Sequence, residues 1–160
     1  MIKRTLFERG CLLKVRVIKL GRIAYPEIRQ LGEMFIKRSA PLARPVQIES
    51  LELKEDASIE AVLEKPANNH PLIALDEGGR EWSSVGLATH LRQMFDDPAI
   101  KSITFLVGAP HGLTEDQRLR AKAIWSLSKV TMTSDMAWLL LWEQIYRSLN
   151  IQKGTGYHHA

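Results

Sequence analysis

Three loops carry small and polar residues that could surround a ligand. They follow apolar segments that end at Leu75, Val107 and Met132. Glycine and alanine let backbone N–H and C=O groups approach a ligand closely, and parallel sheets bind ligands beyond the carboxyl ends of their strands. We therefore predict one shared pocket. Any α/β protein offers such loops, so this pattern alone names no reaction. The loops read Asp76-Glu77-Gly78-Gly79, Gly108-Ala109-Pro110-His111-Gly112 and Thr133-Ser134-Asp135.

The elements that must position these loops alternate between strands and helices. Apolar runs predict strands at residues 14–20, 46–53, 72–75, 103–107 and 129–132. Apolar residues at helical spacing predict helices at residues 25–36, 59–63, 85–95, 114–125 and 136–149. Strands that are apolar runs rather than in/out alternations favour a parallel sheet. The sequence therefore predicts an α/β fold with a mostly parallel sheet and helices on both faces.

Local signals mark several boundaries of these elements. Asp76-Glu77-Gly78-Gly79 predicts a turn that closes the third strand. Thr114 and Gln117 have the spacing of a capping box, which would open the fourth helix. Ser134 or Asp135 is expected to cap the last helix, which is apolar on all sides.

The composition is that of one globular domain. The chain has 160 residues, of which 45% are hydrophobic and 25% charged, so we expect a single domain over residues 1–160. No apolar run reaches the roughly 18–20 residues of a membrane helix, and the first ten residues lack a secretory apolar block. Cys11 is the single cysteine, and no metal-binding cluster is evident. We therefore expect a cytoplasmic protein with no membrane segment and no metal.

The charge is distributed unevenly along the chain. Residues 1–45 hold eleven Lys or Arg against three acidic residues, a net charge of +8, whereas the other 115 residues carry a net charge of −4. Such an imbalance indicates a face that meets a polyanion, and an ordinary solvated surface is the alternative. Dinucleotide, P-loop, zinc-protease and serine-hydrolase motifs are absent from the sequence.

Five segments, taken in order, resemble the RlmH family of SPOUT-class (α/β-knot) methyltransferases, which methylate N3 of a pseudouridine in the large ribosomal RNA. The resemblance spans roughly residues 14–159 and leaves residues 1–13 as an N-terminal extension. Each segment alone is weak evidence for the family, but the order of the segments and the Tyr-His ending are specific to it. The segments are Leu72-Ile73-Ala74-Leu75-Asp76, Phe105-Leu106-Val107-Gly108-Ala109-Pro110-His111-Gly112-Leu113, Trp125-Ser126-Leu127-Ser128-Lys129-Val130-Thr131, Glu143-Gln144-Ile145-Tyr146-Arg147-Ser148 and Gly156-Tyr157-His158.

The resemblance implies a deep C-terminal trefoil knot and a homodimer whose active site uses both subunits. It implies S-adenosylmethionine as the methyl donor, bent among three loops, and ribosomal RNA of the large subunit as the partner. Small residues would let the backbone reach the adenine edge and the ribose, while apolar strand ends would cover the ring faces. The residues carried over to the cofactor pocket are Leu75, Gly108, Ala109, Ser128, Lys129, Val130, Thr131, Met132 and Thr133.

The same resemblance implies catalytic roles for Arg147, Tyr157 and His158. Methylation of the pseudouridine nitrogen requires loss of its imide proton, so either a base near neutral pH or a group that stabilises the anion would serve. His158 suits both roles. Tyr157 could stack on a base or bond to it, and Arg147 could face a phosphate or the target base.

Two departures from the family keep other functions open. The family has a histidine where this chain has Ser134 and an arginine where it has Trp138. The alternatives are a knot methyltransferase of another tRNA or rRNA site, and a catalytically weakened module that binds RNA or the ribosome. We interpret Trp125, Trp138 and Trp142 as packing or dimer-interface residues rather than as platforms for RNA bases.

Overall fold

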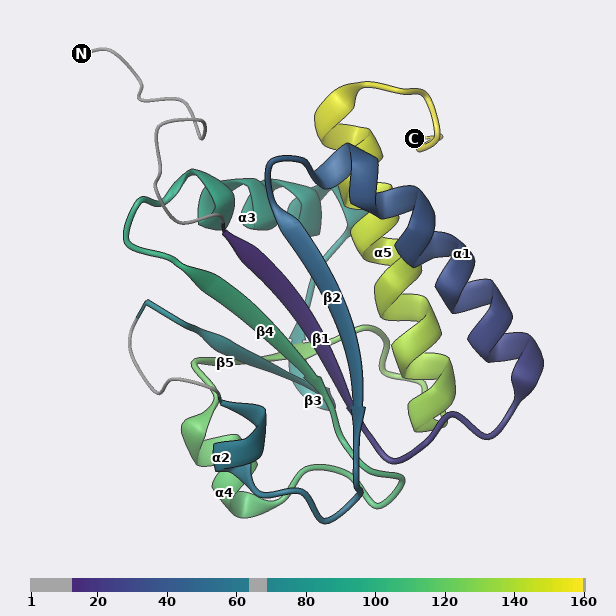
Figure 1. Cartoon of the computed structure of the whole chain (residues 1–160), viewed down its shortest axis with the longest axis vertical. Coiled ribbons are helices and arrows are strands. Elements are labelled where there is room, and N and C mark those ends of the chain that lie inside the picture. Colours follow the sequence, from purple (N-terminus) through teal and green to yellow (C-terminus); the bar gives the residue numbers. More distant parts are fainter. Residues whose placement is uncertain (1–12, 64–68, 160) are drawn as a thin grey trace.

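The computed structural model of the protein describes residues 13–63 and 69–159. Strands and helices alternate along the chain (Figure 1). The elements are β1 (Lys14–Leu20), α1 (Pro26–Ala43), β2 (Gln47–Leu53), α2 (Ile59–Val62), β3 (Leu72–Glu81), α3 (Ser84–Asp96), β4 (Ser102–Val107), α4 (Glu115–Arg120), β5 (Ala123–Ser126) and α5 (Ser134–Lys153).

The five strands form one parallel sheet in the order β2-β1-β4-β3-β5. One apolar cluster lies between the sheet and helices α1, α3 and α5, and a second lies on the side of α2 and α4. Figure 1 shows α1 and α5 side by side on one flank, with α2 beside α4 away from them. The predicted α/β fold with a parallel sheet and helices on both faces is confirmed. The trefoil knot stays a prediction.

Burial of both sheet faces explains the continuous apolar strands. In β1, Val15 and Val17 enter one cluster while Ile18 and Leu20 enter the other, because side chains alternate between faces. Leu13, the last residue of the predicted N-terminal extension, is also buried in the core. Residues 1–12 of that extension lie outside the described residues. Among the described residues, no helix has the length and hydropathy to span a membrane.

The turn expected at residues 76–79 is wrong, because β3 continues through this segment to Glu81. Neither Gly78 nor Gly79 has a positive φ, so the glycines do not reverse the chain. The pairing of β3 with β5 instead shifts register between Leu75 and Arg80. Gly79 is needed for close packing: a Cβ there would lie 2.6 Å from the carbonyl oxygen of Ile124.

Two further boundaries between residues 114 and 133 differ from the prediction. The capping box of Thr114 and Gln117 is confirmed, but the helix that it opens ends at Arg120 and does not reach Trp125. Ile124 and Trp125 instead form the last strand, because β3 offers an unpaired edge and Trp125 packs against Phe105. Residues 129–132, predicted as that strand, form the connection to α5.

The last helix begins two residues earlier than predicted, because Thr133 and not Ser134 or Asp135 caps it: the Thr133 hydroxyl accepts a hydrogen bond from the amide of Met136. Most of the apolar residues of α5 face α1 and α3 of the same chain, and Met136 is an exposed exception.

Trp138 joins α5 to α1 and β2. Its indole N–H donates to the hydroxyl of Ser50, which also accepts from the indole of Trp142. The ring of Trp138 lies on Gly32, where a Cβ would be 2.1 Å from its Cζ3 atom. Trp125, Trp138 and Trp142 are all buried, which confirms packing roles within the chain.

We predict that Gly32→Ala destabilises the protein by about 1–3 kcal/mol, as overpacking of a core does. At an unconstrained helix interior the same change would stabilise by roughly 0.5–1 kcal/mol. Urea unfolding measures the difference. Adding Trp138→Leu to Gly32→Ala should recover part of the loss, because the smaller side chain frees the space. A Gly32→Ala variant more stable than the parent would contradict this packing.

Candidate functional site

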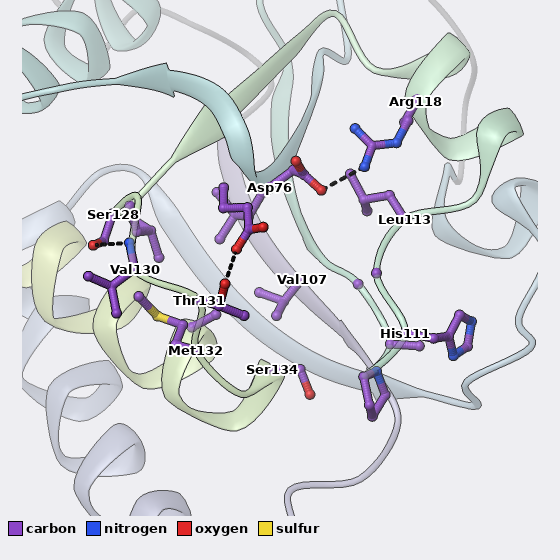
Figure 2. Close-up of a pocket in the computed structure, with 18 residues that line it drawn as sticks. Asp76, Val107, His111, Leu113, Arg118, Ser128, Val130, Thr131, Met132 and Ser134 are labelled. Atoms are coloured by element: carbon purple, nitrogen blue, oxygen red, sulfur yellow. Dashed lines mark hydrogen bonds and ion pairs between the residues drawn. The ribbon is translucent and has the colours of Figure 1, made fainter.

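A cavity of about 430 Å³ lies at the carboxyl edge of the sheet. Residues 75–77 of β3, where its pairing with β4 ends, the end of β4 and the connection from β5 to α5 all reach it, because paired parallel strands end at one edge of the sheet. The predicted pocket shared by three segments is therefore present, although the first segment belongs to β3 and is not a loop (Figure 2). Its lining comprises Leu75, Asp76, Glu77, Val107, Gly108, Ala109, Pro110, His111, Gly112, Leu113, Arg118, Leu127, Ser128, Val130, Thr131, Met132, Ser134 and Ala137.

Most of the predicted cofactor-binding residues line this cavity, but two of the nine do not. Lys129 turns to β3, where its ammonium donates to the carbonyl oxygens of Glu77 and Gly79. Thr133 caps α5. The seven that line the cavity are Leu75, Gly108, Ala109, Ser128, Val130, Thr131 and Met132. Their role in binding a cofactor stays a prediction.

The loop after β4 is compact enough to bring its backbone to the cavity. Gly112 adopts a φ of 92°, and its amide donates to the carbonyl of Ala109 at 2.8 Å. A Cβ on Gly108 would lie 3.1 Å from the Leu113 side chain and 3.3 Å from the Gly112 carbonyl carbon. A larger residue at Gly108 would press against Leu113 and the Gly112 backbone, and a residue with a side chain at Gly112 would be strained by the positive φ. Figure 2 shows the His111 ring pointing away from the other labelled side chains.

Polar contacts tie β3 to the connection that leads to α5 and to α4 beside the cavity. The Thr131 hydroxyl donates to the Glu77 carboxylate at 2.6 Å, and the Arg118 guanidinium donates to the Asp76 carboxylate at 2.7 Å (Figure 2). Arg118 was not among the predicted site residues. The capping box at Thr114 could have found it, because a helix that begins there places Arg118 in its first turns, beside the loop that follows β4.

A buried ion pair lies next to the cavity, at the start of α5. The Lys19 ammonium lies 3.0 Å from the Asp135 carboxylate, and both side chains are almost fully buried. The second oxygen of Asp135 accepts the Ala24 amide at 2.8 Å. Asp135 is the residue after Ser134, which lines the cavity. The ion pair with Lys19 therefore fixes the start of α5 against β1. Sequence reasoning missed this pair, since no local pattern links residues so far apart.

The three predicted catalytic residues meet at the other end of α5. Gly154 ends the helix with a φ of 65°, Gly156 has a φ of 78°, and the chain folds back onto α5. The structure thereby brings the C-terminal tail to Arg147. Arg147 Nη1 lies 3.3 Å from His158 Nδ1, and the Tyr157 hydroxyl donates to Glu143 at 3.1 Å.

Glu143 sets the electrostatics of this cluster. Its hydrogen bond with the guanidinium raises the pKa of Arg147. Burial raises the pKa of Tyr157, and the nearby charge of Glu143 raises it further. Both groups therefore keep their protons throughout the neutral range. The Arg147 guanidinium also lies 4.9 Å from the centre of the Tyr157 ring.

The cavity and the tail cluster lie far apart within one chain. Ser134 lines the cavity at the start of α5, and Arg147 lies thirteen residues further along that helix. At ~1.5 Å per residue the separation along the helix is about 20 Å. The tail cluster therefore does not reach the cavity of its own chain.

Internal ion pairs use part of the positive charge of the N-terminal region. Arg16, Lys19 and Arg29 each pair with a carboxylate of the same chain. The Glu52 carboxylate that holds Arg29 has a lowered pKa, chiefly because of that hydrogen bond. The surface left for a polyanion is thus smaller than the composition suggested. Within residues 13–45, the exposed basic residues are Arg22, Lys37, Arg38 and Arg44.

Comparisons with known proteins agree with one another. Residues 13–158 match the family described as "Predicted SPOUT methyltransferase". The chain is 32% identical to "Ribosomal RNA large subunit methyltransferase H" of Maridesulfovibrio salexigens, over 99% of this chain and 93% of that protein. It is 34% identical to the protein of the same name from Caldicellulosiruptor bescii, over 90% of this chain and 99% of that protein.

Among solved structures, a probable methylase family protein from Haemophilus influenzae Rd KW20 has a similar fold. The TM-score is 0.53 at 10% identity, and the match covers 92% of this chain and 70% of that one. At this identity the likeness concerns the fold alone.

We predict that Lys19→Met destabilises the protein by about 3–5 kcal/mol, because it leaves the Asp135 carboxylate buried without its partner. Lys19→Met with Asp135→Asn should cost less, since a neutral amide can still accept the Ala24 amide. Thermal and urea unfolding provide the measurement. The matched control is Arg92→Met, which removes an exposed ion pair with Asp96 and should change stability by less than about 1 kcal/mol. Equal effects of Lys19→Met and Arg92→Met would refute the role of the buried pair.

Proposed function

This chain belongs to the SPOUT methyltransferase family, and we propose that it uses S-adenosylmethionine to methylate N3 of a pseudouridine in the RNA of the large ribosomal subunit. The observation that carries the proposal is similarity over nearly the whole chain to proteins named for this ribosomal RNA. A substrate of this kind would place the protein in the cytoplasm. We further propose that residues 1–160 act as a single knotted domain.

The residues of the cavity fit the methyl donor. Its volume lies within the range of small-molecule sites, and Leu75, Val107 and Met132 supply apolar surface for an adenine ring. The Gly108-Ala109 turn leaves backbone groups accessible to the edge of that ring. The carboxylates of Asp76 and Glu77 can accept hydrogen bonds from ribose hydroxyls. When bound, S-adenosylmethionine would supply a methyl group carried on a cationic sulfonium.

The distance between the cavity and the tail favours a homodimer with composite active sites. Arg147 contacts His158 and bonds to Glu143, which also accepts from Tyr157, but this cluster lies at the far end of α5 from the cavity of the same chain. In a symmetric dimer each tail can approach the cavity of the partner. The chain would then hold the methyl donor with one subunit and orient the target base with the other.

A module that binds RNA without methylating it is the second candidate. It is favoured by Ser134, which lines the cavity where the family has a histidine, and by Trp138, which packs against α1 where the family has an arginine. The two functions differ in whether the cavity binds S-adenosylmethionine.

We predict that calorimetric titration detects binding of S-adenosylmethionine, and that Gly108→Val weakens it by at least about 10-fold because the larger side chain opens the loop. Arg147→Ala, which alters the tail, should leave this affinity nearly unchanged. Mass spectrometry of large-subunit RNA incubated with the protein and the methyl donor should then reveal a methylated pseudouridine. RNA binding without any binding of S-adenosylmethionine would favour the non-catalytic module.

We also predict complementation between inactive variants. Gly108→Val damages the cavity and Arg147→Ala the tail, so each homodimer should lose methyl transfer. Mixed dimers from co-expression keep one intact composite site, and a random mixture should regain about a quarter of the parent rate. Light scattering should report a dimeric mass for each variant. An inactive mixture of correctly dimeric proteins would mean that each site belongs to a single chain.

A further inference from the structure

The hydrogen bond between Arg147 and His158 restricts what the histidine can do. The guanidinium of Arg147 has five N–H donors and no acceptor. Its Nη1 atom lies 3.3 Å from His158 Nδ1, so Nδ1 must accept and cannot carry a proton in this arrangement. The neutral imidazole then carries its proton on Nε2. His158 therefore presents an N–H donor on the side away from Arg147.

A base in the same position would need the opposite tautomer. To take up a proton on Nε2, His158 would have to carry its first proton on Nδ1, and two donors would then face each other across the 3.3 Å contact. The other nitrogens of Arg147 are held by Glu143, so the guanidinium cannot easily turn away. Tyr157 cannot take up the proton either, because its hydroxyl donates to the same carboxylate and burial raises its pKa, so it stays protonated near neutral pH.

We propose that His158 acts as a hydrogen-bond donor to the deprotonated target base, through Nε2–H, and not as the base that removes its proton. The inference rests on the proposed methyltransferase function. The imide proton leaves to solvent water, and the negative charge that remains on the ring is shared with a carbonyl oxygen that can accept from Nε2–H. Arg147 is a positioning residue in this scheme, since it fixes the tautomer of His158 and reaches the base only through it.

The test compares substitutions that separate donation from basicity. A glutamine amide nitrogen reaches about as far as imidazole Nε2 and donates, but it takes up no proton near neutral pH. An asparagine amide can still accept from Arg147 but is too short to place a donor at the Nε2 position. We expect His158→Gln to keep kcat within about 3-fold of the parent, and both His158→Asn and His158→Ala to lose roughly 10- to 100-fold. His159→Gln, a change of the exposed neighbour, is the control and should have no effect.

The pH dependence gives a second readout. The groups that contact or neighbour His158 in the described cluster are Arg147, Glu143, Tyr157 and His159. If the proton leaves to solvent, the rate–pH profiles of the parent and of His158→Gln have the same shape. If His158→Gln were as impaired as His158→Ala and the acid limb of its rate–pH profile were lost, the proposal would be overturned and His158 would be the base.

A measurement on the protein alone separates this inference from the proposed function. Nitrogen NMR of histidine-labelled protein, with His158 assigned by its absence in His158→Gln, should show a proton on Nε2 and a bare Nδ1, and Arg147→Gln should alter the tautomer balance. A proton on Nδ1 overturns the inference whatever the RNA activity is. A parent protein that transfers no methyl group to ribosomal RNA, yet shows the expected tautomer, would instead count against the proposed function.

Discussion

The parallel order of β4, β3 and β5 is the constraint on which the site depends. Because the strands run in one direction, residues 75–77 of β3 and the segments that leave β4 and β5 meet at one edge of the sheet and enclose a single cavity. Contacts such as Thr131 with Glu77 and Lys129 with the carbonyl of Gly79 then hold those segments in place. The ion pair of Lys19 and Asp135 anchors the start of α5 behind them. The cavity is thus a product of the whole sheet rather than of any one loop.

The long helix α5 separates two kinds of chemistry. Its first turn borders the cavity, while its last turns and the folded-back tail carry an arginine and a tyrosine that share Glu143, and a histidine that contacts the arginine. The cavity and the tail cluster of one chain therefore cannot meet. In the dimer that we propose, the cavity of one subunit would hold the methyl donor and the tail of the other would contact the target base.

Apolar periodicity predicted most of the fold because strands buried on both faces and amphipathic helices leave clear patterns, as in Val15 to Leu20 and in α1. It failed between residues 114 and 133, where β5 forms only because β3 has an unpaired edge, which no local pattern reveals. Family resemblance found seven cavity residues and the tail cluster. It did not find Arg118 or the pair of Lys19 and Asp135, since these contacts join distant segments of this particular sequence.

Hydrogen–deuterium exchange in the presence of S-adenosylhomocysteine tests the central claim most directly. If the three segments at the carboxyl edge enclose the methyl donor, this product should slow exchange at residues 75–79, 107–113 and 127–133, and leave β2 unchanged. Protection confined to other segments, or none at saturating product, would contradict the account and leave the cavity without its assigned ligand.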